Sequence, residues 1–142
     1  MFFRCITVGV RGKMEKIRSG VIGLRIKDAF KQFRDQLVIN QVARAKVPEF
    51  AEDIVIRERI VFSGRVQKVG FRLEVSELAK RLGITGYCEN MENGDVLAEL
   101  QGPKNRIEFL IEFMHRLKRM KINQMNREVL TVNPDERDFT TG

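Results

Sequence analysis

From residue 54 onward, the order in which the hydrophobic patterns change constrains the fold of this 142-residue chain more than any other feature. Residues 54–66 are rich in β-branched side chains, which favour a strand. Apolar residues then recur every three or four positions over residues 71–82, the spacing of one helix face, and Gly83 is a helix-stop signal. Residues 84–90 are again predicted to form a strand.

The following segment repeats this succession of patterns. Asn93-Gly94 is typical of a tight turn between antiparallel strands, and apolar and polar residues alternate after it over residues 96–101. A Gly-Pro pair at 102–103 ends that strand and opens a second helix, because proline is tolerated in the first helical turn. A fourth strand is predicted over residues 121–132, with a possible interruption near Met125.

The resulting order of strand, helix, strand, strand, helix and strand is that of the split β-α-β, ferredoxin-like arrangement. We therefore predict an α+β domain over residues 54–142, with one antiparallel sheet and two helices on one of its faces.

Residues 1–53 are predicted to form a basic helical extension to this domain. Apolar side chains recur at helical spacing between Ile22 and Leu37, so they share one face of a helix that should end before Pro48. We expect that face to dock on the neighbouring domain or to pair with another copy; a membrane-surface helix is the alternative. The start of the chain leaves open a mitochondrial-type transit peptide or translation from Met14.

The net charge of +7 favours an anionic partner. Residues 1–58 hold 12 Lys/Arg against 7 Asp/Glu, so most of the basic excess lies outside the domain and is expected to be a solvated face. Nucleic acid is not expected as a partner, because the chain has no Trp and one Tyr with which to stack bases. A membrane surface is not expected either, because the apolar face of the N-terminal helix is modest.

The cysteine and histidine content argues against a metal site. Cys5 and Cys88 lie far apart, form no Cys-x-x-Cys pair, and accompany a single histidine. A reducing, cytoplasmic location fits this usage. We predict that Cys88 is a packed free thiol on the same side of the sheet as Asn90, and that His115 is a partly exposed structural residue.

The turn between the first strand and the first helix, residues 64–72, is Gly-Arg-Val-Gln-Lys-Val-Gly-Phe-Arg. A glycine-bearing loop that enters a helix can direct several backbone amides at one anion, where the helix also presents a partial positive charge. Arg72 falls in the first helical turn, where its guanidinium could take two phosphate oxygens. The turn is therefore a candidate anion site, although an arginine at this position can also be simply solvated.

Four segments together resemble the acylphosphatase family. They are residues 64–72, residues 82–90 (Leu-Gly-Ile-Thr-Gly-Tyr-Cys-Glu-Asn), Asn93-Gly94-Asp95-Val96 and Gln101-Gly102-Pro103. The order and spacing of the segments also match, and the resemblance runs from about Glu58 to Phe139.

The resemblance implies a small ferredoxin-like enzyme that hydrolyses the carboxyl-phosphate bond of acyl phosphates without a metal or other cofactor. It implies that Arg72 binds the phosphoryl group and that Asn90, at the end of the second strand, orients the attacking water. It also implies that the backbone amides of the loop cradle the phosphate oxygens; these residues are Gln67, Lys68, Val69, Gly70 and Phe71. The chemistry fits, because an acyl phosphate has a good leaving group and needs mainly positioning and charge stabilisation.

Lys68 departs from the family pattern, which has glycine at this position. If the loop needs a positive φ there, lysine costs roughly 1–2 kcal/mol. The loop then either keeps its shape with Lys68 at its rim, or is distorted, which would leave a non-catalytic phosphate-binding regulatory module. We expect activity to be retained.

Overall fold

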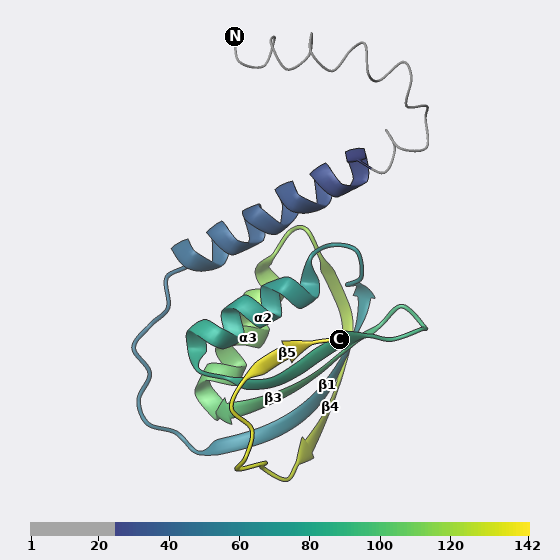
Figure 1. The fold of residues 1–142 in the computed structure, drawn as a ribbon. Coiled ribbons are helices and arrows are strands. Elements are labelled where there is room, and N and C mark those ends of the chain that lie inside the picture. Colours follow the sequence, from purple (N-terminus) through teal and green to yellow (C-terminus); the bar gives the residue numbers. More distant parts are fainter. Residues whose placement is uncertain (1–24) are drawn as a thin grey trace, which may run out of the picture. The chain divides into compact units, whose positions relative to one another are not determined.

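The computed structural model describes residues 25–142 of the chain (Figure 1). The predictions about a transit peptide, a start at Met14 and the state of Cys5 concern residues outside this range. The chain divides into two compact units, and the boundary between them lies between Gln36 and Leu37. In the part of the chain that is described, no helix is long and apolar enough to cross a lipid bilayer.

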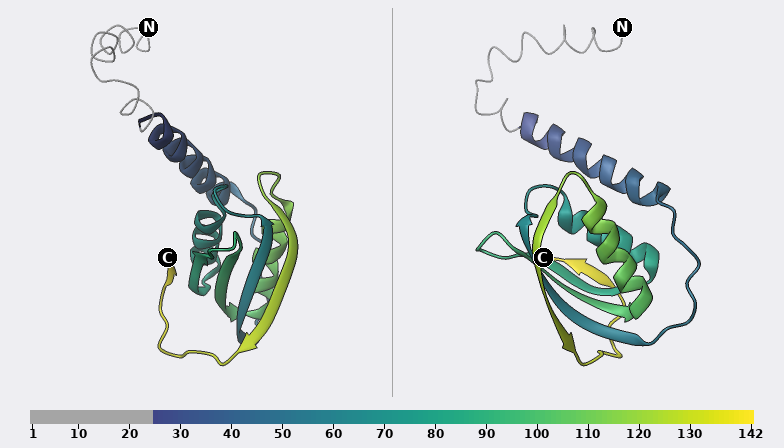
Figure 2. Two further views of the ribbon diagram at one scale, coloured as in Figure 1. Left: turned by 90° about the vertical axis from the view of Figure 1, so that its right-hand side faces the viewer. Right: turned by 180° about the vertical axis from the view of Figure 1, so that it is seen from behind.

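The second unit contains a five-stranded sheet whose strand order is β4-β1-β3-β2-β5. The elements are β1 (Val55–Arg65), α2 (Phe71–Leu82), β2 (Thr85–Asn90), β3 (Val96–Pro103), α3 (Lys104–Arg116), β4 (Lys121–Leu130) and β5 (Phe139–Thr141). The helices α2 and α3 lie against one face of the sheet (Figure 2). The predicted ferredoxin-like fold is thus confirmed, and β4 runs without the interruption considered near Met125.

The short strand β5 was not predicted, because three residues after a proline carry no recognisable alternation. It pairs with β2 in the parallel direction, so the sheet is mixed at this edge. At Gly86, where this pairing begins, φ is +137° and an added Cβ would lie 1.8 Å from the carbonyl oxygen of Glu99. Glycine is therefore required where β2 approaches β3 most closely.

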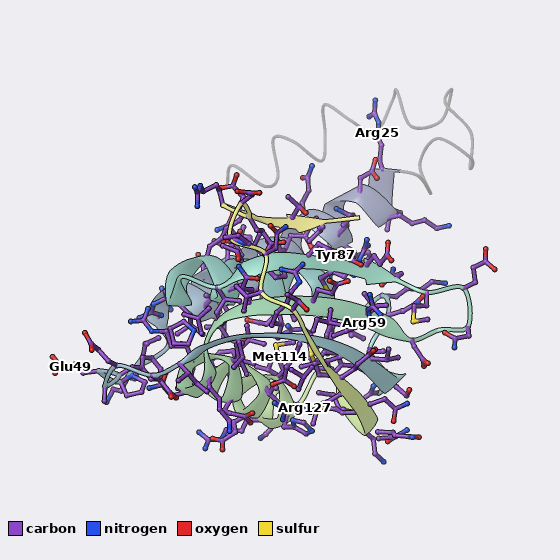
Figure 3. The ribbon with its side chains drawn as sticks, turned by 90° about the horizontal axis from the view of Figure 1, so that it is seen from below. Arg25, Glu49, Arg59, Tyr87, Met114 and Arg127 are labelled. Atoms are coloured by element: carbon purple, nitrogen blue, oxygen red, sulfur yellow. The ribbon has the colours of Figure 1, made fainter. Side chains whose placement is uncertain are left out.

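The two faces of the sheet have different chemistry. The helix-covered face is apolar and includes Ile60, Phe62 and Cys88, all fully buried. The opposite face carries an ion-pair network around Glu99, whose carboxylate accepts hydrogen bonds from Arg59 and Tyr87, both labelled in Figure 3. The pairing of Arg59 and Tyr87 with Glu99 across the strands places all three side chains on this face.

Residues 37–53 pack on the domain as part of the same compact unit. Val42, near the end of a helix that covers residues 25–44, is buried in the core cluster, whereas Leu37 of the predicted apolar stripe is 51% exposed. The ring of Phe50 meets Phe109 of α3 edge-on at 5.6 Å between centroids. The carboxylate of Asp53 accepts the N–H of Asn105 in the first turn of α3 at 2.9 Å. These contacts connect residues 37–53 to the domain, while the boundary at residue 53 stays a prediction.

Candidate active site

The turn between β1 and α2 has an unusual backbone. Gly64 has a φ of +128°, and a Cβ there would lie 2.2 Å from the carbonyl oxygen of Lys121 on the neighbouring strand. Gly70 caps α2 in the left-handed conformation, with a φ of +81°. Lys68 has a φ of +61° and is the one residue other than glycine with a positive φ in residues 25–142. The left-handed geometry for which the sequence analysis assigned a cost to Lys68 is therefore present.

The side chain of Gln67 ties this turn to the connection between β2 and β3. Its amide nitrogen donates to the carbonyl oxygens of Met91 at 2.7 Å and Asp95 at 2.8 Å. Met91 directly follows β2 and Asp95 directly precedes β3, so the two hydrogen bonds fasten the turn to both ends of the connection between these strands. The two partners of the Gln67 side chain lie more than twenty positions away, so no local pattern in the sequence indicates this role.

Arg72 lies in the first turn of α2 and reaches towards β2 and β5. Its guanidinium donates a hydrogen bond to the carbonyl oxygen of Gly142. Burial raises the pKa of the Cys88 thiol to about 12, and the positive charge of Arg72 opposes that rise. The N–H of Gly142 in turn donates to the carbonyl oxygen of Cys88 at 2.9 Å, so Gly142 links Arg72 to the second half of β2. As predicted, Cys88 is a buried free thiol.

Asn90 is the last residue of β2 and is exposed. It pairs directly with Val96, a fully buried residue on the helix-covered face of the sheet. Asn90 is two positions after Cys88, so both project towards the side of the sheet on which Arg72 lies. The two side chains that the resemblance assigned to catalysis therefore lie on the same side of the sheet.

The backbone of the turn leaves several amides available as donors. Within residues 25–142, the backbone hydrogen bonds outside helices and strands include none donated by Gln67, Val69 or Gly70. The first N–H groups of a helix also lack partners within the helix, which adds the amide of Phe71. The side chain of Phe71 is buried, with its ring centroid 5.0 Å from that of Phe62, so only its backbone could face a ligand.

Two charged residues that the sequence analysis missed lie beneath the turn. Arg119 donates to the carbonyl oxygen of Val69 at 2.7 Å and to the carboxylate of Glu74 at 2.5 Å. Burial raises the pKa of Glu74, and the bound guanidinium opposes that rise. Arg119 is fifty positions from Val69, and no spacing in the sequence marks this contact. His115 is exposed, and its Nδ1 forms a hydrogen bond with the carbonyl oxygen of Ile111, one turn earlier in the same helix, at 2.9 Å.

This side of the sheet provides a guanidinium, a row of amides at a helix N-terminus and the side-chain amide of Asn90. The first two favour a tetrahedral oxyanion, because backbone donors and the helix dipole attract negative charge. A carboxamide has both a donor and an acceptor, so it can hold a water molecule in a defined orientation.

Comparison with known proteins gives a consistent result. The acylphosphatase family model matches residues 58–141, more than half of the chain. The chain is 36% identical over 88 residues to an acylphosphatase of Clostridium perfringens, covering 61% of this chain and 99% of that protein. It is 37% identical over 78 residues to an acylphosphatase of Vibrio parahaemolyticus, covering 54% and 87%.

Solved structures agree with this match. The crystal structure of an acylphosphatase from Bacillus subtilis has a TM-score of 0.57 and 25% identity, over 61% of this chain and 98% of that chain. An acylphosphatase from Coxiella burnetii has a TM-score of 0.57 and 29% identity, over 62% and 93%.

Proposed function

Because the chain belongs to the acylphosphatase family, we propose that it hydrolyses acyl phosphates at the turn before α2, with Arg72 and Asn90 in the catalytic roles. The reaction breaks the carboxyl-phosphate bond of a small-molecule acyl phosphate and releases a carboxylate and inorganic phosphate. We also propose a cytoplasmic location, which the buried free thiol of Cys88 supports.

In the proposed mechanism, the phosphoryl oxygens lie between the guanidinium of Arg72 and the amides of residues 67–71. Both sets of donors stabilise the negative charge that develops in the transition state. Asn90 holds a water molecule in line with the bond to the leaving group. The water oxygen attacks phosphorus, the phosphorus–oxygen bond to the acyl group breaks, and the carboxylate leaves with the bonding electrons. One proton of the water stays on its oxygen, which becomes part of the phosphate, and the other passes to another phosphate oxygen or to solvent.

The observation that carries this proposal is the convergence of three separate segments at the end of β2. Gln67 donates a hydrogen bond to the carbonyl of the residue after Asn90. Arg72 donates to the carbonyl of Gly142, whose own N–H donates to the carbonyl of Cys88, two positions before Asn90, at 2.9 Å. A cation in the first turn of a helix is unfavourable beside the positive end of the helix dipole. A bound oxyanion between the two would relieve that repulsion, which supports a binding role for Arg72.

The test is hydrolysis of benzoyl phosphate by the purified full chain, with Arg72→Ala and Asn90→Ala variants. Arg65 at the other end of the same turn is exposed, and Arg65→Ala is the matched control for loss of one positive charge. We expect Arg72→Ala to lower kcat/KM by about 10²–10³-fold, the usual effect of removing an oxyanion donor. Asn90→Ala should lower kcat by about 10²-fold through misplacement of the water, and Arg65→Ala should change kcat/KM less than threefold, roughly the effect of a screened surface charge.

Turnover by the unaltered chain that equals the uncatalysed rate would refute the proposal. In that case a titration with inorganic phosphate distinguishes two outcomes. Phosphate binding that is lost in Arg72→Ala would identify the turn as a non-catalytic binding site, and no binding at all would remove the anion site as well.

A further inference from the structure

Arg119, in the connection between α3 and β4, makes three hydrogen bonds through its guanidinium. The Nε donates to the carbonyl oxygen of Val69 at 2.7 Å, and the two terminal nitrogens donate to Glu74 at 2.5 Å and to Gln41 at 3.3 Å. The side chain is 28% exposed, whereas the carboxylate that it binds is completely buried. Each nitrogen of this guanidinium therefore donates a hydrogen bond to a different segment of the chain.

The contact with Val69 determines the direction of a neighbouring amide. The peptide bond between Val69 and Gly70 is trans, since residues 25–142 contain no cis peptide. In a planar trans peptide the C=O and the following N–H point in opposite directions. When Arg119 holds the carbonyl of Val69 on one side of the turn, the N–H of Gly70 must face the other side. Gly70 is the N-cap of α2, so this amide belongs to the candidate phosphate cradle.

Glu74 in turn holds Arg119. Its backbone N–H bonds the carbonyl of Gly70 at 3.0 Å, which places its side chain one helical turn below the cradle. One carboxylate oxygen binds Arg119, and the other is buried without a partner among the described residues. Such a half-satisfied buried carboxylate is costly, so its pairing with Arg119 fixes the guanidinium rather than letting it turn to solvent.

We propose that Arg119 is a positioning residue for the phosphate loop: it fixes the Val69–Gly70 peptide so that the Gly70 amide faces the phosphoryl group. Glu74 is the counter-ion that holds Arg119 in place. The contact of Arg119 with Gln41 links the same guanidinium to the end of the N-terminal helix, within the same compact unit. The proposal rests on the phosphate-binding role proposed above for the turn.

The chain offers a matched control for removing this arginine. Arg127 on β4, labelled in Figure 3, binds the buried carboxylate of Glu58 through two hydrogen bonds of 2.7 Å and is 31% exposed. It resembles Arg119 in exposure and in the burial of its partner, but its hydrogen bonds are to Glu58 and Glu108 and none reaches the turn. Arg119→Met and Arg127→Met therefore both break an ion pair with a buried glutamate, and only the first releases the carbonyl of Val69.

We expect Arg119→Met to raise the inhibition constant of inorganic phosphate and to lower kcat/KM for benzoyl phosphate, each by about tenfold, as a partly misdirected oxyanion donor would. Arg127→Met should lower Tm by a similar amount and leave both constants within about twofold, because it leaves the cradle intact. Glu74→Gln keeps the acceptor for Arg119 but removes its charge, so it should shift both constants in the same direction by a smaller factor. It also serves as the second variant if Arg119→Met does not fold.

The amide ¹⁵N chemical shift of Gly70 provides a readout that does not depend on catalysis. It should change in ligand-free Arg119→Met and stay unchanged in Arg127→Met. If the unaltered chain hydrolyses benzoyl phosphate and Arg119→Met matches it in kcat/KM and phosphate inhibition, the positioning role is wrong and the proposed function stands. If the unaltered chain neither hydrolyses benzoyl phosphate nor binds inorganic phosphate, the proposed function fails. The Gly70 shift then decides whether Arg119 orients the peptide, and an unchanged shift overturns that role too.

Discussion

The left-handed backbone of Lys68 predicts that replacing this residue by glycine stabilises the protein. In the left-handed region, the backbone of a residue with a Cβ is strained by roughly 1–2 kcal/mol compared with its right-handed conformation. Lys68 lies in this region, since its φ is +61°. Glycine relieves that strain but gives the unfolded chain extra conformational freedom, which costs roughly 0.4–1 kcal/mol. The difference is a net gain of about 0.5–1 kcal/mol, or a rise in Tm of about 2–4 °C for a chain of this size.

The informative comparison is between Lys68→Gly and Lys68→Ala. Both variants remove the charge and the side-chain contacts of the exposed lysine, but alanine keeps the Cβ and therefore the strain. The free energy of unfolding, from urea titrations followed by circular dichroism, should be higher for the glycine variant. Activity on benzoyl phosphate should also be higher for glycine than for alanine, because the relaxed turn can direct its amides at the substrate without strain.

Lys118 provides the control, because the difference in stability between its glycine and alanine variants should have the opposite sign. It is an exposed residue in a turn, and its φ is negative, since Lys68 alone among the described residues other than glycine has a positive φ. Lys118→Gly should be less stable than Lys118→Ala by roughly 0.4–1 kcal/mol. If Lys68→Gly were also less stable than Lys68→Ala, the left-handed strain inferred at the turn would be refuted.

Two further predictions concern Cys88 and the extension. The raised pKa of Cys88 means that its buried neutral thiol supports stability fully below the unfolded value of 9.0, and that this support is lost as pH rises towards about 12. In a Cys5→Ser background, native protein at pH 8 should therefore react with a thiol reagent only as fast as it unfolds, and rapid labelling would contradict the burial. A chain of residues 37–142 should keep the Tm of the full chain. In a chain of residues 54–142 the free energy of unfolding should be lower by at least about 2 kcal/mol, because Val42 is missing from the core. Equal denaturation midpoints for the two truncated chains would show that residues 37–53 contribute nothing to stability.

The order of strands and helices in the domain was predictable from the sequence, for a physical reason. Each element carries a period set by its own backbone geometry, and the turn residues mark where one period gives way to the next. The helix from Phe71 to Leu82, bounded by Gly70 and Gly83, appears in the structure at the predicted residues. The split β-α-β topology follows from that order, because few arrangements can bury all the apolar faces at once.

The candidate catalytic residues were also named from the sequence, but through resemblance to a family rather than through periodicity. By their physical chemistry alone, residues 64–72 indicate an anion-binding turn and nothing more specific. Asn90 by itself is an ordinary asparagine at the end of a strand, and only the resemblance to the family made it a candidate for holding water.

The tertiary structure alone decided which residues support the turn. Arg119 and Glu74 meet beneath it, and Gln67 fastens it to the β2–β3 connection, through contacts between segments far apart in the sequence. Strand β5 likewise exists because β2 offers it an unpaired edge, not because three residues have a strong preference of their own. A local pattern records what a segment prefers by itself, whereas a hydrogen bond between distant segments depends on where the whole chain brings them.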